Sequence, residues 1–408
     1  MKSKLNDKKY IAIAKKITKD HQLCDFCLGR FFYKVEKAES NKTIGKKLRN
    51  KLNIKEIDPK NCWLCEGLID EIDFFVKLIR THLKEYEFDT FLVGSKVDED
   101  ILERENELIN LSDLDTHESI KNEINREIGK ILEQKIDKLV DFEKPSIMVI
   151  LDTAFNEINL QIQSLYVYGR YNKYSRELPQ TKWYCKYCKG KGCRKCFYSG
   201  KLYKNSVEEL VSKKFLDATK GTDEKFHGAG REDIDVLMLG TGRPFVLEII
   251  NPKIRSIDLD DLTKKINKKN KEIIKITNLK FCKKQEISRI KAAKFKKEYR
   301  VKFECEKAIN NEKLIKAIQS LRGTVISQFT PSRVAHRRAE MVREKHIYNC
   351  QLESLEDTMA IITLETESGT YIKEIVSGDQ GKTKPNLSEM LGCPCKVKEL
   401  DVINIKGE

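Results

Sequence analysis

Four Cys-x-x-Cys pairs constrain this chain more than any other feature of its sequence. The paired cysteines are Cys24, Cys27, Cys62, Cys65, Cys185, Cys188, Cys193 and Cys196. The remaining cysteines, Cys282, Cys305, Cys350, Cys393 and Cys395, are scattered. The Lys-rich N-terminal stretch does not resemble a secretory signal, so the paired spacing favours metal binding over disulfides. Because four thiolates complete the tetrahedral coordination of a structural zinc ion, two such sites are predicted.

The two predicted sites differ in how closely the sequence groups their ligands. Thirty-four residues separate Cys27 from Cys62, a gap that a helix can fill; reduced pairs in a core or redox dithiols are the alternatives. The segment from Cys185 to Cys196 holds two knuckles almost back to back, whose glycines let tight turns direct backbone N–H groups at sulfur. It has no open ligand position and no neighbouring His or Glu, which favours a structural metal over a catalytic one.

The positive charge of the chain is concentrated in two segments. The formal net charge is +15. Residues 181–205 hold eight Lys or Arg and no acid, and residues 264–300 hold fifteen against three Glu. This placement is expected of a protein that grips a polyanion at defined places, and the alternative is two solvated Lys-rich loops. No apolar run reaches the length of about 18 residues that a membrane helix needs, so a cytoplasmic protein is expected.

Residues 227–253 are the richest stretch in candidate catalytic groups. They open with two glycines around an alanine and continue into two apolar runs separated by Gly240-Thr241-Gly242, a pattern that predicts a loop, a strand, a tight turn and a second strand. The charged residues after the glycines are Arg231, Glu232, Asp233 and Asp235. A carboxylate between a flexible loop and a buried strand, near a guanidinium, can stay ionised in a partly dry pocket. The residues alone do not choose among the three acids, and Asp233 could also cap a turn.

Two later segments add cations and a tyrosine. The first is a Thr330-Pro331 turn followed by a basic cluster, which can clamp phosphates or form an exposed basic turn. The members of this cluster are Arg333, His336, Arg337 and Arg338. The second runs from Gly369 through Tyr371 and Lys373 and is expected to lead from a strand into the start of a helix.

Four blocks of the sequence together resemble a known family. They are residues 227–236, 240–245, 330–338 and 369–386, in one order over about 160 residues. The C-terminal half that contains them resembles a pseudouridine synthase and is closest to the archaeal and eukaryotic family that makes pseudouridine at tRNA positions 54 and 55. The N-terminal region resembles, much more loosely, an accessory module with a THUMP RNA-binding fold.

The resemblance implies roles for individual residues. Asp233 matches the nucleophilic aspartate, Lys373 the basic residue that pairs with it, and Tyr299 the tyrosine that packs on the flipped uracil. The expected substrate-binding residues are Tyr299, Tyr371, Arg231, Arg333, His336 and Arg337. The chemistry is consistent with these roles, because breaking and remaking a glycosidic bond needs an ionised nucleophile, and a uridine within a folded loop must be flipped out onto an aromatic side chain. The alternatives are core tyrosines and a solvated lysine.

The expected fold class is α+β. It consists of a mostly antiparallel sheet of pseudouridine-synthase type with flanking helices, preceded by a zinc- and THUMP-like α/β module. The expected divisions are a zinc segment at 1–75, a THUMP-like module at 76–180, a basic zinc-knuckle linker at 181–205 and a catalytic domain at 206–408. Asp233 is expected on the floor of a central cleft, and residues 264–297 are expected to form one or two mobile basic arms that grip the RNA.

The activity that the resemblance implies is isomerisation of uridines 54 and 55 in the T-arm loop of tRNA, by a monomer that needs no catalytic cofactor. One rival class is another THUMP-bearing tRNA enzyme, such as a methyltransferase or a thiouridine synthase. Such enzymes need a Gly-rich cofactor loop between a strand and a helix, or an ATP-binding signature, and the sequence contains neither. The other rival is a non-catalytic zinc protein that binds RNA.

Overall fold

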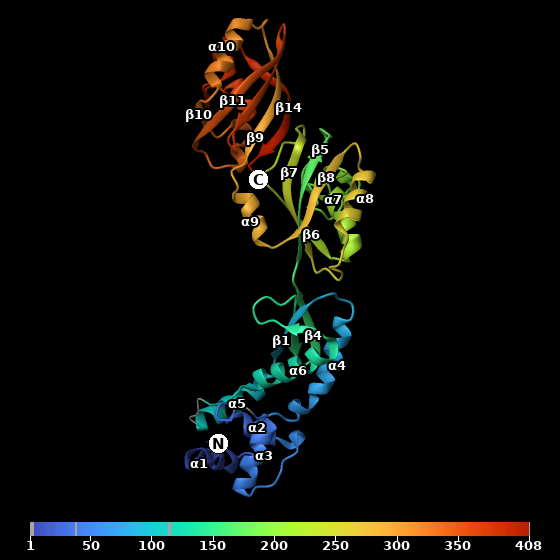
Figure 1. The fold of residues 1–408 in the computed structure, drawn as a ribbon, viewed down its shortest axis with the longest axis vertical. Helices are drawn as coiled ribbons and strands as arrows, with labels where there is room; N and C mark the ends of the chain where they lie inside the picture. The colour runs from blue at the N-terminus through green and yellow to red at the C-terminus, as the bar shows by residue number, and fades with distance from the viewer. Residues whose placement is uncertain (1–3, 37–38, 113–115, 408) are drawn as a thin grey trace. The chain divides into compact units, whose positions relative to one another are not determined.

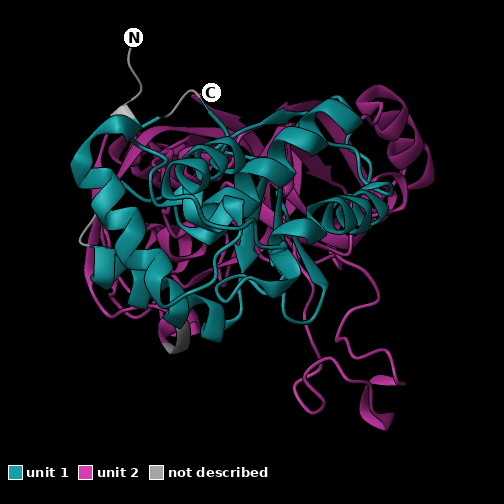
Figure 2. Cartoon of the chain, turned by 90° about the horizontal axis from the view of Figure 1, so that it is seen from below, with its two compact units in different colours: residues 1–163, 251–255 teal, residues 164–250, 256–408 magenta. Residues whose placement is uncertain are grey.

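The chain folds into two compact units (Figures 1 and 2). The computed structural model describes residues 4–36, 39–112 and 116–407. Unit 1 comprises residues 1–163 and 251–255, and unit 2 comprises residues 164–250 and 256–408. The division expected at residue 180 therefore differs from the structure. The strand of residues 165–173 pairs with two strands of unit 2, where most of its side chains are buried.

Unit 1 combines helices with a small sheet. Its helices are α1 (Lys8–Lys19), α2 (Asp25–Arg30), α3 (Asn41–Leu52), α4 (Ile72–Leu83), α5 (Glu99–Ser112) and α6 (Ile120–Ile136). Its strands are β1 (Thr90–Lys96), β2 (Leu139–Val140), β3 (Ile147–Asp152) and β4 (Glu157–Ile162), in the order β2-β1-β3-β4. The apolar residues of α6 that recur at helical spacing, such as Ile124 and Ile128, are buried in the core of this unit, as the periodicity predicts.

Unit 2 is built on one sheet of ten described strands. They are β5 (Leu165–Lys173), β6 (Asp223–Gly228), β7 (Leu237–Ile250), β8 (Ile274–Cys282), β9 (Lys296–Cys305), β10 (Val325–Phe329), β11 (Val342–Glu356), β12 (Met359–Thr366), β13 (Thr383–Lys384) and β14 (Cys395–Lys406). Their order is β13-β10-β11-β12-β9-β14-β7-β5-β8, with β6 paired to β7. Among these strands, only the short pairing of β14 with β7 is parallel. The predicted mostly antiparallel sheet is thus confirmed.

Helices flank this sheet, also as predicted. They are α7 (Val207–Thr219), α8 (Leu259–Lys269), α9 (Gln285–Ala292), α10 (Asn311–Leu321), α11 (Ile372–Ser377) and α12 (Leu387–Leu391). Helix α8 contacts β8, α10 contacts β11, and α11 contacts β14. The short 3-10 helices are η1 (Lys4–Asn6), η2 (Pro59–Asn61), η3 (Leu68–Glu71), η4 (Arg194–Cys196) and η5 (Ser332–Arg337). No helix among the described residues combines the length and apolar character that crossing a bilayer requires.

Strand β9 sets the position of the functional site. It lies between β12 and β14, and its side chains alternate between a buried and a more open face. Tyr299, Val301 and Phe303 all lie on the buried face, and the two-residue period of a strand places Lys297 on that face too. A lysine and a tyrosine are therefore held side by side by the same rigid strand.

The turn predicted at Gly240-Thr241-Gly242 is wrong. These residues lie inside the continuous strand β7, where Gly240 and Gly242 adopt φ values of 57° and 74°. A Cβ on Gly240 would lie 1.9 Å from the carbonyl oxygen of Ile403. The glycines therefore allow β7 to bend while neighbouring backbone passes close by, which is how strand glycines often act.

The mobile basic arms predicted for residues 264–297 are also wrong. This segment forms the end of α8, the strand β8, the helix α9 and the start of β9. Ile274 and Ile276 of β8 are buried in the core, and β8 pairs with β5 along its length. Lys275 and Lys280 remain exposed, so the positive charge lies on ordered elements.

Candidate active site and cysteine clusters

A pocket of about 670 Å³ in unit 2 brings together most of the predicted site residues. Its walls come from the loop before β7, from β9, from η5 and from the start of α11. The predicted residues that line it are Arg231, Asp233, Tyr299, Arg333, Tyr371 and Lys373. The side chains of His336 and Arg337, which were also predicted to bind substrate, lie outside the described residues.

Asp233 lies between two cations. Its Oδ2 atom is 3.1 Å from Nη1 of Arg333 and 3.6 Å from Nζ of Lys373. The Asp233 side chain is 36% exposed, so its carboxylate remains accessible. Arg333 is oriented in turn by the buried Glu374, whose Oε1 accepts a hydrogen bond of 2.7 Å from Nε. An accessible carboxylate held between two cations is in a position to act as a nucleophile.

The three acids of this stretch lie in different surroundings. Glu232 is buried and forms an ion pair of 2.8 Å with Arg243, and the hydroxyl of Tyr171 donates its single proton to the same carboxylate, with both oxygens within 3.0 Å. Asp235 is 63% exposed, and its Oδ2 lies 3.0 Å from Nζ of Lys373. Although burial acts in the opposite direction, the hydrogen bond and charge of Lys373 lower the pKa of Asp235. Only Asp233 of these three is both accessible and adjacent to Arg333.

The acid nearest to Lys373 is Asp235, whereas the resemblance implied Asp233. Its Nζ lies closer to Asp235 than to Asp233, and the nearest cation to Asp233 is Arg333. Sequence reasoning placed Arg333 among phosphate-binding residues. The carboxylate and the guanidinium are 100 positions apart, so their contact depends on the folded sheet.

The floor of the pocket contains buried charged groups that sequence reasoning missed. Lys297 and Arg243 both line the pocket beside Tyr299. Burial, together with the charge of Arg243, lowers the pKa of Lys297 to about 7, and burial raises the pKa of Tyr299 to about 12. The phenol of Tyr299 is thus neutral near pH 7, and its ring is available for packing against a base. The alternation of β9 was a signal that could have identified Lys297.

Residues from β10 and β11 complete the pocket. Gln328 holds the backbone of Tyr371 with two hydrogen bonds of 2.9 Å, one donated by its amide nitrogen and one accepted by its oxygen. Arg343 and Lys345 of β11 also line the pocket, as does Arg338. The pocket is therefore strongly cationic around Asp233, which suits a phosphate-bearing ligand.

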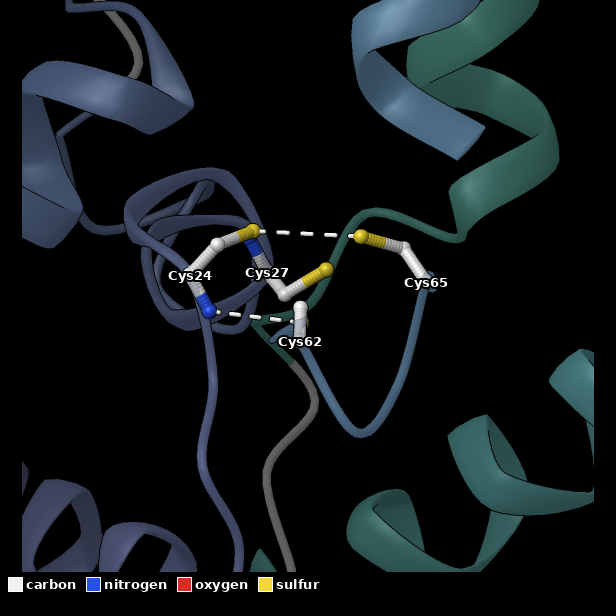
Figure 3. Close-up of side chains that lie close together, drawn as sticks. All are labelled: Cys24, Cys27, Cys62 and Cys65. Carbon is white, nitrogen blue, oxygen red and sulfur yellow. Dashed lines mark hydrogen bonds between the residues drawn. The ribbon is translucent and has the colours of Figure 1, made fainter. Parts of the chain in front are cut away.

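The eight paired cysteines form two compact clusters of four (Figure 3 shows the first). Cys24 and Cys65 have sulfur atoms 3.9 Å apart, and the backbone N–H of Cys24 points at the sulfur of Cys62. In the second cluster the sulfur of Cys188 accepts a hydrogen bond from the backbone N–H of Gly192. Sulfur atoms at the usual Zn–S distance of about 2.3 Å lie about 3.8 Å apart in a tetrahedron. Both donor sets thus fit a tetrahedral thiophilic metal.

A third cysteine group was not anticipated. Cys305, Cys393 and Cys395 have sulfur atoms within 4.8 Å of one another. Pairing of β9 with β14 places Cys305 opposite Cys395, although 90 positions separate them in the chain. Such a group is set by strand register, so local spacing in the sequence could not identify it.

A mostly antiparallel sheet with an aspartate facing a cationic pocket, next to a buried tyrosine, is the arrangement expected of a pseudouridine synthase. Comparison with protein families agrees and is more specific. The family described as "Pus10, C-terminal" matches residues 166–406, and the one described as "Pus10 THUMP domain, archaeal" matches residues 75–152. The chain therefore belongs to the Pus10 family of tRNA pseudouridine synthases, which are isomerases.

Curated relatives match along nearly the whole chain. The tRNA pseudouridine synthase Pus10 of Halorubrum lacusprofundi is 37% identical over 98% of this chain and 96% of its own length. That of Methanocaldococcus jannaschii is 39% identical over 95% of this chain and 93% of its own length. Among solved structures, a Cbf5-Nop10-Gar1 complex matches 49% of this chain and 45% of its own with 15% identity and a TM-score of 0.32. That similarity is too low for a comparison of detail.

Proposed function

We propose that the chain converts uridine to pseudouridine at positions 54 and 55 of the tRNA T-arm loop, with Asp233 as the nucleophile. Family membership supports the reaction and the substrate class. The observation that carries the choice of Asp233 is its accessible carboxylate, 3.1 Å from Arg333, while the neighbouring Glu232 is buried against Arg243. We place this activity in the cytoplasm and assign it to a monomer.

The residues around Asp233 have complementary roles in this proposal. Arg333 and Lys373 contact the carboxylate of Asp233 and hold it in place for attack on the nucleotide. The carboxylate of Asp233 attacks C1′ of the ribose as the bond between C1′ and N1 of the base breaks, the base turns, and C5 then attacks C1′ and displaces the carboxylate. The proton leaves C5, and N1 gains one, so that the product is an isomer. No organic cofactor is needed for this exchange.

The remaining residues hold the flipped nucleotide. Tyr299 packs its ring on the uracil, since its buried position on β9 fixes the ring orientation. Tyr371, whose backbone Gln328 holds in place, lines the other side of the nucleotide. Arg231 occupies the space left by the base or contacts a flanking phosphate, and the η5 residues His336 and Arg337 bind phosphate.

The positions of modification can be tested directly. Transcripts of one tRNA are prepared with uridine at position 54 only, at 55 only, at both, or at neither, and pseudouridine is mapped after incubation with the protein. We expect product at each position where uridine is present and none in the transcript that lacks both. Product at one position alone would restrict the specificity, and product in the transcript without either uridine would reject the assigned substrate site.

We also propose the divisions of the chain and the metals that stabilise them. Residues 1–75 and 181–205 each contain a structural zinc site, the THUMP-like module that binds RNA ends near residue 163, and the catalytic domain comprises β5 together with residues 206–408. In residues 181–205, four thiolates would replace a hydrophobic core that so short a segment cannot build, whereas the first cluster lies within the apolar core of unit 1.

Removal of one ligand should empty one zinc site and leave the other. We expect about two zinc ions per wild-type chain, and about one for either Cys62→Ser or Cys185→Ser, as measured by elemental mass spectrometry. Cys282→Ser, which changes a cysteine outside the clusters, serves as the matched control and should retain about two. Wild-type protein purified without zinc or another thiophilic metal would contradict the assignment.

A further inference from the structure

The second cysteine cluster lies in a segment that exposes aromatic side chains with no role in the proposed chemistry. We call residues 181–205 the knob. Four of its aromatic side chains project into solvent. They are Tyr184 at 59% exposure, Tyr187 at 70%, Phe197 at 91% and Tyr198 at 71%. Aromatic rings usually bury most of their surface, and a group of exposed rings commonly marks a binding surface.

The backbone of the knob holds two of these rings in an unfavourable conformation. Phe197 and Tyr198 have φ values of 50° and 60°, in the left-handed region that favours glycine. The turn is fixed by hydrogen bonds to the carbonyl of Cys193 from Tyr198 and to the sulfur of Cys196 from Gly200. Glycine would suit both positions better for folding. Exposed aromatic residues at such positions are therefore candidates for contact with a partner.

The charge of the knob identifies the partner's chemistry. It carries eight Lys or Arg and no acid, and the exposed cations are Lys186, Lys189, Lys191, Arg194, Lys195 and Lys204. The ammonium of Lys195 lies 3.7 Å from the centre of the Tyr187 ring. Exposed rings interleaved with cations fit a polyanion that presents flat base faces. That is single-stranded nucleic acid, since a duplex hides its bases.

The base of the knob lies next to the loop that carries Asp233. At its base, Trp183 lines a smaller pocket of about 240 Å³ together with Arg231 and Asp233. The guanidinium of Arg231 stacks over the Trp183 ring at 5.5 Å from its centre. The base of the knob thus lies beside the loop that carries the proposed nucleophile.

We propose that the knob is a second RNA-binding surface, on which Tyr187, Phe197 and Tyr198 stack unpaired bases of the same RNA whose uridine enters the pocket. This rests on the proposed function for the identity of the RNA. The cysteine cluster provides the rigid support, and the lysines contact the backbone. The aromatic side chains contribute affinity without sequence preference, because every base offers a face for stacking.

The test uses a double variant that introduces no backbone strain. Phe197→Gly/Tyr198→Gly removes both rings at positions where glycine is conformationally favoured. Its affinity is measured by fluorescence anisotropy with a labelled T-arm stem-loop RNA, at several salt concentrations and without turnover. We expect binding to weaken by at least about tenfold, with an unchanged salt slope because no cation is lost. Phe197→Trp/Tyr198→Phe keeps stacking surfaces and should bind like wild type.

Two further measurements make the result decisive. Affinity for a fully paired RNA of the same length should not change in the glycine variant, and its zinc content should equal that of wild type. Unchanged affinity for the stem-loop, with zinc intact, would overturn the proposal. Loss of pseudouridine formation by the wild-type protein would instead reject the proposed function, while the binding comparison would still decide the role of the knob.

Discussion

Asp233→Asn should reduce pseudouridine formation by at least about 10³-fold. The amide has the same shape as the carboxylate but cannot act as the nucleophile. It also removes the negative charge that Arg333 and Lys373 contact at 3.1 and 3.6 Å. Because the pocket shape is retained, RNA affinity should change little or rise slightly. The assay follows tritium release from tRNA labelled at C5 of uridine, under single-turnover conditions that separate chemistry from product release.

The matched control is Asp235→Asn, two positions away. Asp235 pairs with Lys373 at 3.0 Å but is 63% exposed, so its loss should cost no more than about tenfold in rate, as expected for a weak surface ion pair. Turnover near the wild-type rate in Asp233→Asn would reject Asp233 as the nucleophile. If Asp235→Asn were the inactive variant, Lys373 would be serving Asp235, and the assignment of the two acids would be exchanged.

Residues 227–253 show what local sequence can predict about the site. The glycines, the arginine and the acids place a charged loop before a buried strand, and the structure has that order. The residues alone did not choose among three acids, because the choice depends on partners. Glu232 forms an ion pair with Arg243 of β7 beneath the pocket, and Asp233 is contacted by Arg333, 100 positions away. The resemblance of whole motifs chose Asp233, which remains a prediction until the variant is measured.

The fold also shows that local sequence patterns do not determine which strands become partners. The helical periodicity of α6 and the alternation of β9 are local patterns, and both elements are present as expected. The turn expected at Gly240-Thr241-Gly242 is absent because β7 continues through it, paired to β5 and β14. The basic segment 264–297 is likewise ordered by β5, whose pairing with β8 involves residues about 100 positions apart. Where a partner strand decides the conformation, local propensity is overridden.

Arg243→Met should destabilise unit 2 by about 3–5 kcal/mol. Arg243 and Glu232 form a 2.8 Å ion pair whose side chains are each 1% exposed. Removing the guanidinium leaves a buried carboxylate without its cation, and that desolvated charge is costly. The hydroxyl of Tyr171 and Gln180 beside it would still hydrogen bond within this network but cannot supply a positive charge. The measurement is urea denaturation followed by a probe confined to unit 2, such as Trp183 fluorescence in a Trp63→Phe background.

Two controls distinguish the effect of breaking a buried ion pair from the effect of removing any arginine. Arg300→Met removes an arginine from β9 whose pair with Glu353 is exposed, at 50% and 33%, and should cost less than about 1 kcal/mol. The double variant Glu232→Met/Arg243→Met removes both charges and should recover much of the lost stability, because a buried pair is often replaceable by apolar side chains. If the double variant were as unstable as the single one, the destabilisation would come from lost packing. The floor of the pocket beneath Asp233 would then depend on the shape of Arg243 and not on its charge.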